Sequence, residues 1–150
     1  NIFKEFLNLD LKTDFVNAYP KIFFDYINSG RKRLSATSLC CLLSGVRLKS
    51  STDLRRGKAL SAEINNSIWV NKLNYKLNVI KPETAVRRLV KIAQQNHFTL
   101  FEYFLTDHIG HGIDPGRQQA IAVFRQRDQH HRRRRFVIDF AAGGTNTAAD

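Results

Sequence analysis

The chain has 150 residues, of which 43% are hydrophobic and 25% charged, a composition typical of one globular domain that excludes wholesale disorder. Its formal net charge of +11 indicates a polyanionic partner. No run approaches the roughly eighteen apolar residues of a membrane helix, and the first residues lack the zones of a signal peptide, so we expect a cytoplasmic protein without membrane contact.

The first thirty residues are rich in aromatic side chains, and we expect them to form a helical arm. Apolar residues within 3–11 are spaced as on one face of a helix. The same spacing runs through residues 15–27, past Pro20, and ends at Gly30, a residue type that commonly terminates helices. The arm is therefore predicted to be helical and to belong to the core.

Two short helices are predicted next. Ser35 or Thr37 suits the N-cap of an apolar helix that ends at Gly45, and we expect this helix to be buried. Ser51 suits the N-cap of a second helix, which Gly57 interrupts.

A third and longer helix is predicted after Ser61, with Ile64, Ile68 and Leu73 facing inward. At its end, apolar and polar residues alternate over residues 73–79. Alternation is typical of a strand, and the preceding spacing is typical of a helix, so both interpretations of this end stay open.

Further helices are predicted in the second half of the chain. Pro82 suits the first turn of a helix over residues 82–93, and the spacing repeats over residues 99–109 and 120–124. The Gly-, Thr- and Ala-rich residues 141–150 offer no packing material, which indicates a flexible tail. The expected fold is mainly α, with a single small helical domain over residues 1–140 and one short β-hairpin or wing as an option.

Basic charge is concentrated in residues 31–91, which carry fourteen Lys and Arg against three Asp and Glu and so equal the whole net excess. Residues 92–140 form a further expected helical region with an arginine-rich end, in which residues 125–135 hold six arginines and two histidines. Arginine matches phosphate geometry, and arginine-rich segments bind RNA or nucleic-acid backbone. The alternative is that this run is a solubilising tail.

The stretch "LCCLLSGVRLKSSTDLRRGKALSAEINNSIWVNKLNYKLNVIKP", residues 39–82, resembles a helix-turn-helix domain of the winged-helix style. The resemblance lies in the order of the parts: a short apolar helix ending in Ser-Gly, a second helix after a Ser/Thr cap, a third ending in Leu-x-x-x-Leu, then an extended apolar pair before Pro. It implies a third helix that enters a DNA major groove. Its outward polar residues would be Asn65, Asn66, Trp69, Asn71, Lys72 and Lys76.

These patterns select a set of candidate contacts to nucleic acid. Asparagine pairs with adenine, and lysine and arginine reach guanine or phosphate. The alternative is that the same residues form an ordinary solvated face. The candidates are Arg31, Lys32, Arg33, Arg47, Lys49, Arg55, Arg56, Lys58, Asn71, Lys72, Lys76, Arg132, Arg133, Arg134 and Arg135.

Catalysis, metals and cofactors are not expected. Residues 42–48 and 108–112 resemble two boxes of tyrosine recombinases, but no tyrosine follows Tyr103 to act as the nucleophile. His108 and His111 are spaced for one helix face, but neighbouring glycines argue against that helix and against a metal site. The adjacent Cys40 and Cys41 suit reduced core thiols rather than a disulfide.

The sequence therefore predicts a non-enzymatic nucleic-acid-binding protein, with DNA favoured over RNA. One alternative is an RNA-binding component of a ribonucleoprotein, which the arginine run favours. The other is a structural or adaptor protein that docks on a protein partner, or on a second copy of itself, through the Phe-rich arm or through the apolar cluster at residues 136–140.

Overall fold

The computed structural model describes residues 1–30 and 33–104. Its elements are α1 (Ile2–Asn8), β1 (Thr13–Phe15), β2 (Ala18–Tyr19), α2 (Lys21–Asn28), α3 (Ala36–Ser44), β3 (Lys49–Ser50), α4 (Ser51–Arg55), α5 (Ser67–Asn71), α6 (Pro82–Ala93) and β4 (Phe98–Leu100). Helices make up 45% and strands 12% of the described residues, so the fold is mixed. The expected helices make up the larger part of the regular structure, but the expectation of a mainly α fold is corrected because two small parallel sheets are also present.

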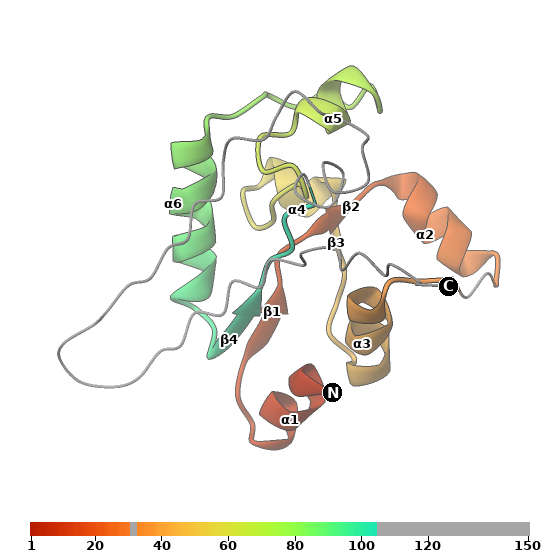
Figure 1. The fold of residues 1–150 in the computed structure, drawn as a ribbon, viewed down its shortest axis with the longest axis vertical. Helices are drawn as coiled ribbons and strands as arrows, with labels where there is room; N and C mark the ends of the chain where they lie inside the picture. The colour runs from red at the N-terminus through yellow and green to blue at the C-terminus, as the bar shows by residue number, and fades with distance from the viewer. Residues whose placement is uncertain (31–32, 105–150) are drawn as a thin grey trace, which may run out of the picture.

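A central extended segment, residues 13–19, organises the described fold (Figure 1). Its first half, β1, pairs in parallel with β4. Its second half, β2, pairs in parallel with β3, and the peptide groups of Ala18 and Leu60 are joined by a hydrogen bond of 2.8 Å. The side chain of Asn17 takes the place of a strand partner for Glu102. Its Nδ2 donates a hydrogen bond to Glu102 O, and its Oδ1 accepts one from Glu102 N. The segment thus ties both halves of the chain together.

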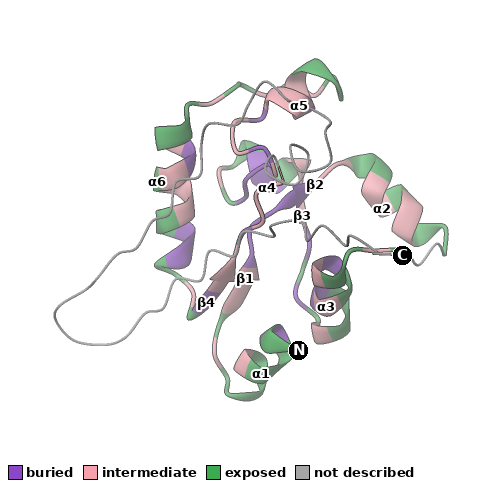
Figure 2. Cartoon of the chain, viewed as in Figure 1, coloured by how far each residue is buried: buried purple, intermediate pink, exposed green. Residues whose placement is uncertain are grey.

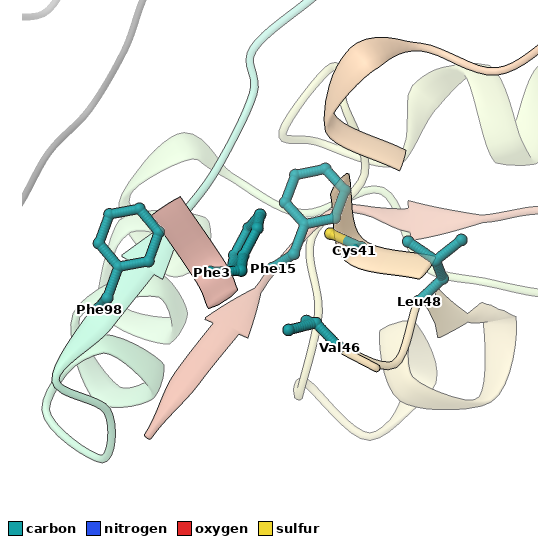
Figure 3. Close-up of a cluster of buried hydrophobic side chains, with 6 residues drawn as sticks. All are labelled: Phe3, Phe15, Cys41, Val46, Leu48 and Phe98. Atoms are coloured by element: carbon teal, nitrogen blue, oxygen red, sulfur yellow. The ribbon is translucent and has the colours of Figure 1, made fainter. Parts of the chain in front are cut away.

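The buried hydrophobic side chains of the described residues form three clusters, and phenylalanines are the main members of the first. One cluster contains Phe3, Phe15, Cys41, Val46, Leu48 and Phe98 (Figure 3). Phe3 contacts Phe98 edge-on, with ring centroids 5.5 Å apart, and this arrangement contributes on the order of 1 kcal/mol beyond apolar burial. Phe6 stacks on the same ring at 4.9 Å. The rings of Phe3 and Phe15 therefore belong to the core, whereas α2 of the same arm has no buried residue and leaves Ile22 71% exposed.

The predicted continuous helix over residues 15–27 is wrong. Residues 13–19 are extended, and α2 begins only at Lys21, after Pro20. Proline disfavours helical geometry in the residue before it, and Phe15 and Val16 are fully buried between pairing partners. Burial on both sides favours a strand, which the helical spacing alone did not reveal.

The helix predicted over residues 99–109 is also corrected over its described part, because Phe98–Leu100 forms β4 against β1 and residues 101–104 are not helical. Residues 105–109 lie outside the described residues. The helix expected from Ser61 is shortened to α5, since residues 61–66 form turns with positive φ at Ile64 and Asn66. Residues 73–79 form neither the strand nor the helix considered for them. The predicted third helix and wing are thus replaced by a five-residue helix and an irregular connection.

Two helices follow their predicted caps. Ser35 accepts the hydrogen bond of Ser38 N at the start of α3, and Gly45 ends that helix at φ 75°. Helix α6 begins with Pro82 as predicted and buries Ala85, Ile92 and Ala93 on one face. The expectation that α3 is buried is wrong for most of its apolar residues. Its Leu39, Leu42 and Leu43 are exposed, and the ribbon of α3 in Figure 2 is only partly purple.

No helix within residues 1–30 and 33–104 is long and apolar enough to cross a bilayer. Predictions for the arginine-rich end, for His108 and His111, for the apolar cluster at residues 136–140 and for the tail at residues 141–150 lie outside the described residues.

Candidate nucleic-acid interface

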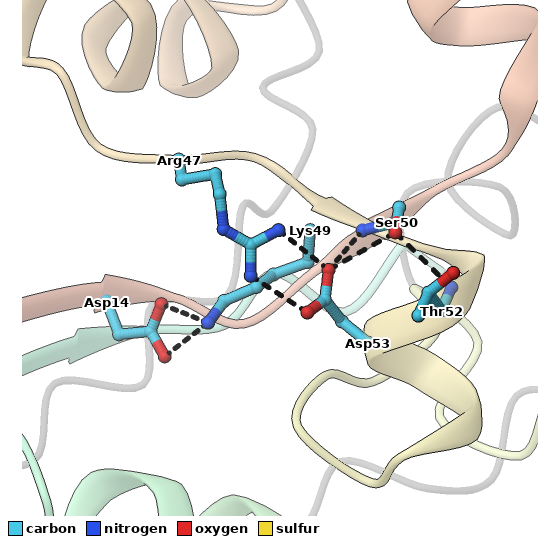
Figure 4. A network of polar contacts seen from close by, with 6 residues as sticks. All are labelled: Asp14, Arg47, Lys49, Ser50, Thr52 and Asp53. Atoms are coloured by element: carbon cyan, nitrogen blue, oxygen red, sulfur yellow. Dashed lines mark hydrogen bonds and ion pairs between the residues drawn. The ribbon is translucent and has the colours of Figure 1, made fainter.

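Helix α4 is fixed by a capping box at its first turn (Figure 4). The Ser50 hydroxyl accepts a hydrogen bond from Thr52 N, and Asp53 Oδ2 accepts one from Ser50 N at 2.8 Å. Each such cap contributes on the order of 1 kcal/mol to helix stability. The sequence predicted a cap here, one residue later than the Ser50 that the structure uses. The cap sets the position of the basic residues that follow.

Arg47 binds the same carboxylate from the preceding segment. Its Nη1 and Nη2 donate to the two oxygens of Asp53 at 2.9 and 2.8 Å, a bidentate pair. These hydrogen bonds hold the pKa of Asp53 well below its usual range, and the same pair raises the pKa of Arg47. Arg47 therefore serves first as an anchor for α4, although its side chain is 64% exposed.

Lys49 lies in a second ion pair, with Asp14 of β1. Its Nζ is 2.8 Å from Asp14 Oδ1, and the two side chains are only 13% and 14% exposed. Burial raises the pKa of Asp14, and the hydrogen bond and charge of Lys49 act in the opposite direction. The ammonium group of Lys49 is thus held by Asp14, so this geometry does not support the prediction that Lys49 contacts nucleic acid.

Arg55, Arg56 and Lys58 follow the anchored turn and are exposed. Among the described residues none of them has an ion pair or side-chain hydrogen bond. Between them Gly57 adopts φ 67°, a conformation that costs other residues about 1 to 2 kcal/mol. The glycine thus turns the chain so that cations stand on both sides of it.

Arg88 of α6 joins this group. A Cβ added to Gly57 would lie 3.3 Å from Arg88 Nε, so the guanidinium lies directly against the turn. Arg88 also lacks an ion pair among the described residues. We call Arg55, Arg56, Lys58 and Arg88 the α4–α6 basic surface. Figure 1 shows the two elements beside each other on one side of the central segment.

Arg88 is the one member of this surface that was not selected from the sequence. A signal existed, because Arg88 comes three residues after the buried Ala85 and four before the buried Ile92, so helical spacing places it beside the packed face of α6. What the sequence does not contain is the approach of α6 to Gly57, which depends on tertiary packing.

The predicted base-recognition face is divided by the structure. Asn71, Lys72 and Lys76 are exposed at the end of α5 and beyond it. Asn66 is buried and donates to Asn78 O at 3.0 Å, and Trp69 is buried against Tyr75. At 3.6 residues per turn, a five-residue helix makes about 1.4 turns, too short to present a row of side chains along a groove. Asn66 and Trp69 therefore serve the fold.

The remaining candidates are dispersed. Arg33 is exposed just before α3, on a different element from the α4–α6 basic surface. Arg31, Lys32 and Arg132, Arg133, Arg134 and Arg135 lie outside the described residues. Within residues 1–30 and 33–104 no group of three His, Cys, Asp or Glu side chains is placed to hold a metal ion.

Comparisons of the chain with protein-family models, with curated proteins and with solved structures find no match.

Proposed function

We propose that the protein binds nucleic acid through the phosphate backbone, with duplex DNA as its first target and the α4–α6 basic surface as the point of contact. The observation that carries the proposal is the packing of Arg88 against the turn at Gly57, which gathers four cations from two elements. None of the four has an acidic partner among the described residues. Unpaired guanidinium and ammonium groups exchange condensed counterions for direct phosphate contacts.

Backbone contact is favoured over base recognition. The helix that would enter the groove has five residues, and two of its expected polar contacts are buried in the fold. Asn71, Lys72 and Lys76 remain exposed and are proposed as flanking contacts to phosphate and sugar. Contacts of this kind set position and affinity and carry no sequence information.

The adaptor alternative has less support at the start of the arm, where Phe3 and Phe15 are 1% and 0% exposed and pack against each other. It keeps support at α2, which has no buried residue and leaves Ile22 71% exposed, and its second docking element, residues 136–140, lies outside the described residues. The RNA alternative keeps its argument, because the arginine run at residues 125–135 suits RNA as well as DNA. The proposed role is binding alone, with no catalytic step.

The test is the affinity of the full chain for a duplex DNA, the matching duplex RNA and each single strand over a salt series. The four cations of the α4–α6 basic surface contribute about −3.6 to the slope of log affinity against log salt for duplex DNA, and phosphate contacts by Lys72 and Lys76 would steepen it to about −5.4. We expect duplex DNA to bind most tightly. A slope near zero for every nucleic acid would reject the proposal, and tighter binding of RNA would transfer it to the ribonucleoprotein alternative.

A further inference from the structure

A cavity of about 190 Å³ lies beside the central segment, between the residues around Pro20 and the turn that leads into α5. Its walls are largely apolar, and three aromatic residues contribute to them: Tyr19, Trp69 and Phe104. Contacts with neighbouring rings hold two of these aromatic walls in place. Tyr19 stacks on Phe23 with ring centroids 4.0 Å apart, and Trp69 packs edge-on against Tyr75 with ring centroids 4.9 Å apart. An engineered cavity of roughly 150 Å³ holds benzene, so this space suits a body slightly larger than one aromatic ring.

One acidic residue, Glu63, also lines this cavity. It is only 5% exposed, and its Oε1 accepts a hydrogen bond of 3.1 Å from Ile68 N, which belongs to the same wall. That hydrogen bond orients the carboxylate, but its donor is a neutral backbone group and does not balance the carboxylate's charge. Within the described ranges no Lys, Arg or His forms an ion pair with Glu63.

Two other carboxylates of low exposure behave differently. Asp14 meets Lys49 at 2.8 Å, and Asp53 meets Arg47 at 2.8 Å. A buried carboxylate is costly unless it is paired. Glu102 also has no cation among the described residues, and its Oε2 is buried without a hydrogen-bond partner, but it does not line the cavity. Glu63 is therefore the carboxylate without a described cation that lines this cavity.

We propose that this cavity binds a small organic cation: a primary ammonium group carried on an apolar body about the size of one ring. The ammonium group meets the Glu63 carboxylate, and the body lies among Tyr19, Trp69 and Phe104. Aromatic walls suit this ligand twice, because they bury its apolar body and attract its positive charge. The site is separate from the α4–α6 basic surface and does not require that nucleic acid binds there.

Trp69 supplies the measurement, since it is the one tryptophan of the chain and lines the cavity. The full chain, free of nucleic acid, is titrated with benzylammonium chloride while tryptophan fluorescence is followed. Benzyl alcohol is the neutral control of nearly the same shape, and benzoate is the anionic control. We expect benzylammonium to bind about tenfold more tightly than benzyl alcohol, as a hydrogen bond to a charged group predicts, and benzoate not to bind.

Two variants test the residues. Glu63→Gln keeps an oxygen that accepts from Ile68 N but removes the charge, so it should erase the preference for the amine over the alcohol. Glu83→Gln, at an exposed acid in the first turn of α6, is the matched control and should keep the preference. Ala62→Leu fills the cavity while Glu63 is retained, and should abolish binding of both compounds, which keeps the test decisive if Glu63→Gln melts early.

Nα-acetyl-lysine methylamide, added in a parallel titration, distinguishes the lysine side chain of a polypeptide from a free amine as the source of the ammonium group. Binding of either amine that weakens in Glu63→Gln to the level of benzyl alcohol supports the site. Equal binding of benzylammonium and benzyl alcohol, or no response to any amine, would overturn the proposal, and neither result would bear on nucleic-acid binding.

Discussion

Replacing Arg56 and Lys58 by glutamine should weaken nucleic-acid binding through the loss of two phosphate contacts. Both residues are exposed and flank Gly57, where Arg88 approaches the turn. Each phosphate contact on duplex DNA contributes about 0.9 to the slope of log affinity against log salt, so the loss of two contacts should flatten the slope by about 1.8. Between about 50 and 200 mM salt, the loss of affinity should therefore be about twelvefold larger for the unmodified chain than for the double variant.

The assay is fluorescence anisotropy of a labelled duplex at several salt concentrations. Lys4→Gln with Lys21→Gln is the matched control, because it removes the same charge from exposed positions on α1 and α2. If net charge alone drives binding, both double variants will flatten the slope equally. That result would refute the assignment of binding to the α4–α6 basic surface.

Three further predictions concern single residues. Asp53→Asn should lower the free energy of unfolding by about 1 to 2 kcal/mol at neutral pH, because a bidentate charged hydrogen bond is lost. Since the hydrogen bonds of Arg47 hold the folded-state pKa of Asp53 below its usual range, this contribution is complete above the unfolded pKa of about 4 and disappears as pH falls through the lower folded value. Urea titrations from neutral to acidic pH should show the two proteins converging in acid, and a constant gap would contradict the assignment. Burial raises the pKa of Cys41 to about 12, so a thiol reagent should label Cys40 in the native protein and both thiols after denaturation, as mass spectrometry of labelled peptides will show. Asn71→Ala should change affinity equally, and little, for all duplex sequences selected from a random library, whereas a loss of roughly 1 to 3 kcal/mol on one sequence would restore base recognition by α5.

The helices with strong local signals could be predicted from the sequence. Ser35 and Gly45 bound α3, and Pro82 opens α6, because caps and first-turn prolines act through neighbouring backbone groups. The burial of α3 was not predictable in the same way. Its Leu43 is 71% exposed, although an apolar run usually indicates core.

The strands could not be predicted, because their partners are distant in the chain. Thr13 pairs with Phe98, and Ala18 pairs with Lys49. Each strand has two or three residues, too few for alternation to stand out from helical spacing. Phe15 fits both patterns, and the parallel neighbour that decides between them joins β1 only in the folded chain.

In the candidate site, too, some features could be predicted from the sequence and others depend on contacts between distant residues. Arg55, Arg56 and Lys58 were found from charge density, and the structure leaves them exposed. Lys49 was selected on the same ground, yet it is paired with Asp14 across thirty-five positions of sequence. The density of charge along the sequence does not show which cations are paired with acidic residues in the folded chain. Arg88 was missed because its approach to Gly57 depends on tertiary packing.

Lysine acetylation of the full chain, with and without duplex DNA, tests the central claim most directly. Lys58 lies on the α4–α6 basic surface, Lys4 and Lys21 lie on α1 and α2, and Lys49 is buried in its ion pair. Mass spectrometry of brief acetylation should show that DNA protects Lys58, leaves Lys4 and Lys21 reactive, and does not alter the low reactivity of Lys49. Equal acetylation of Lys58 in the presence and absence of bound DNA would contradict the proposed interface.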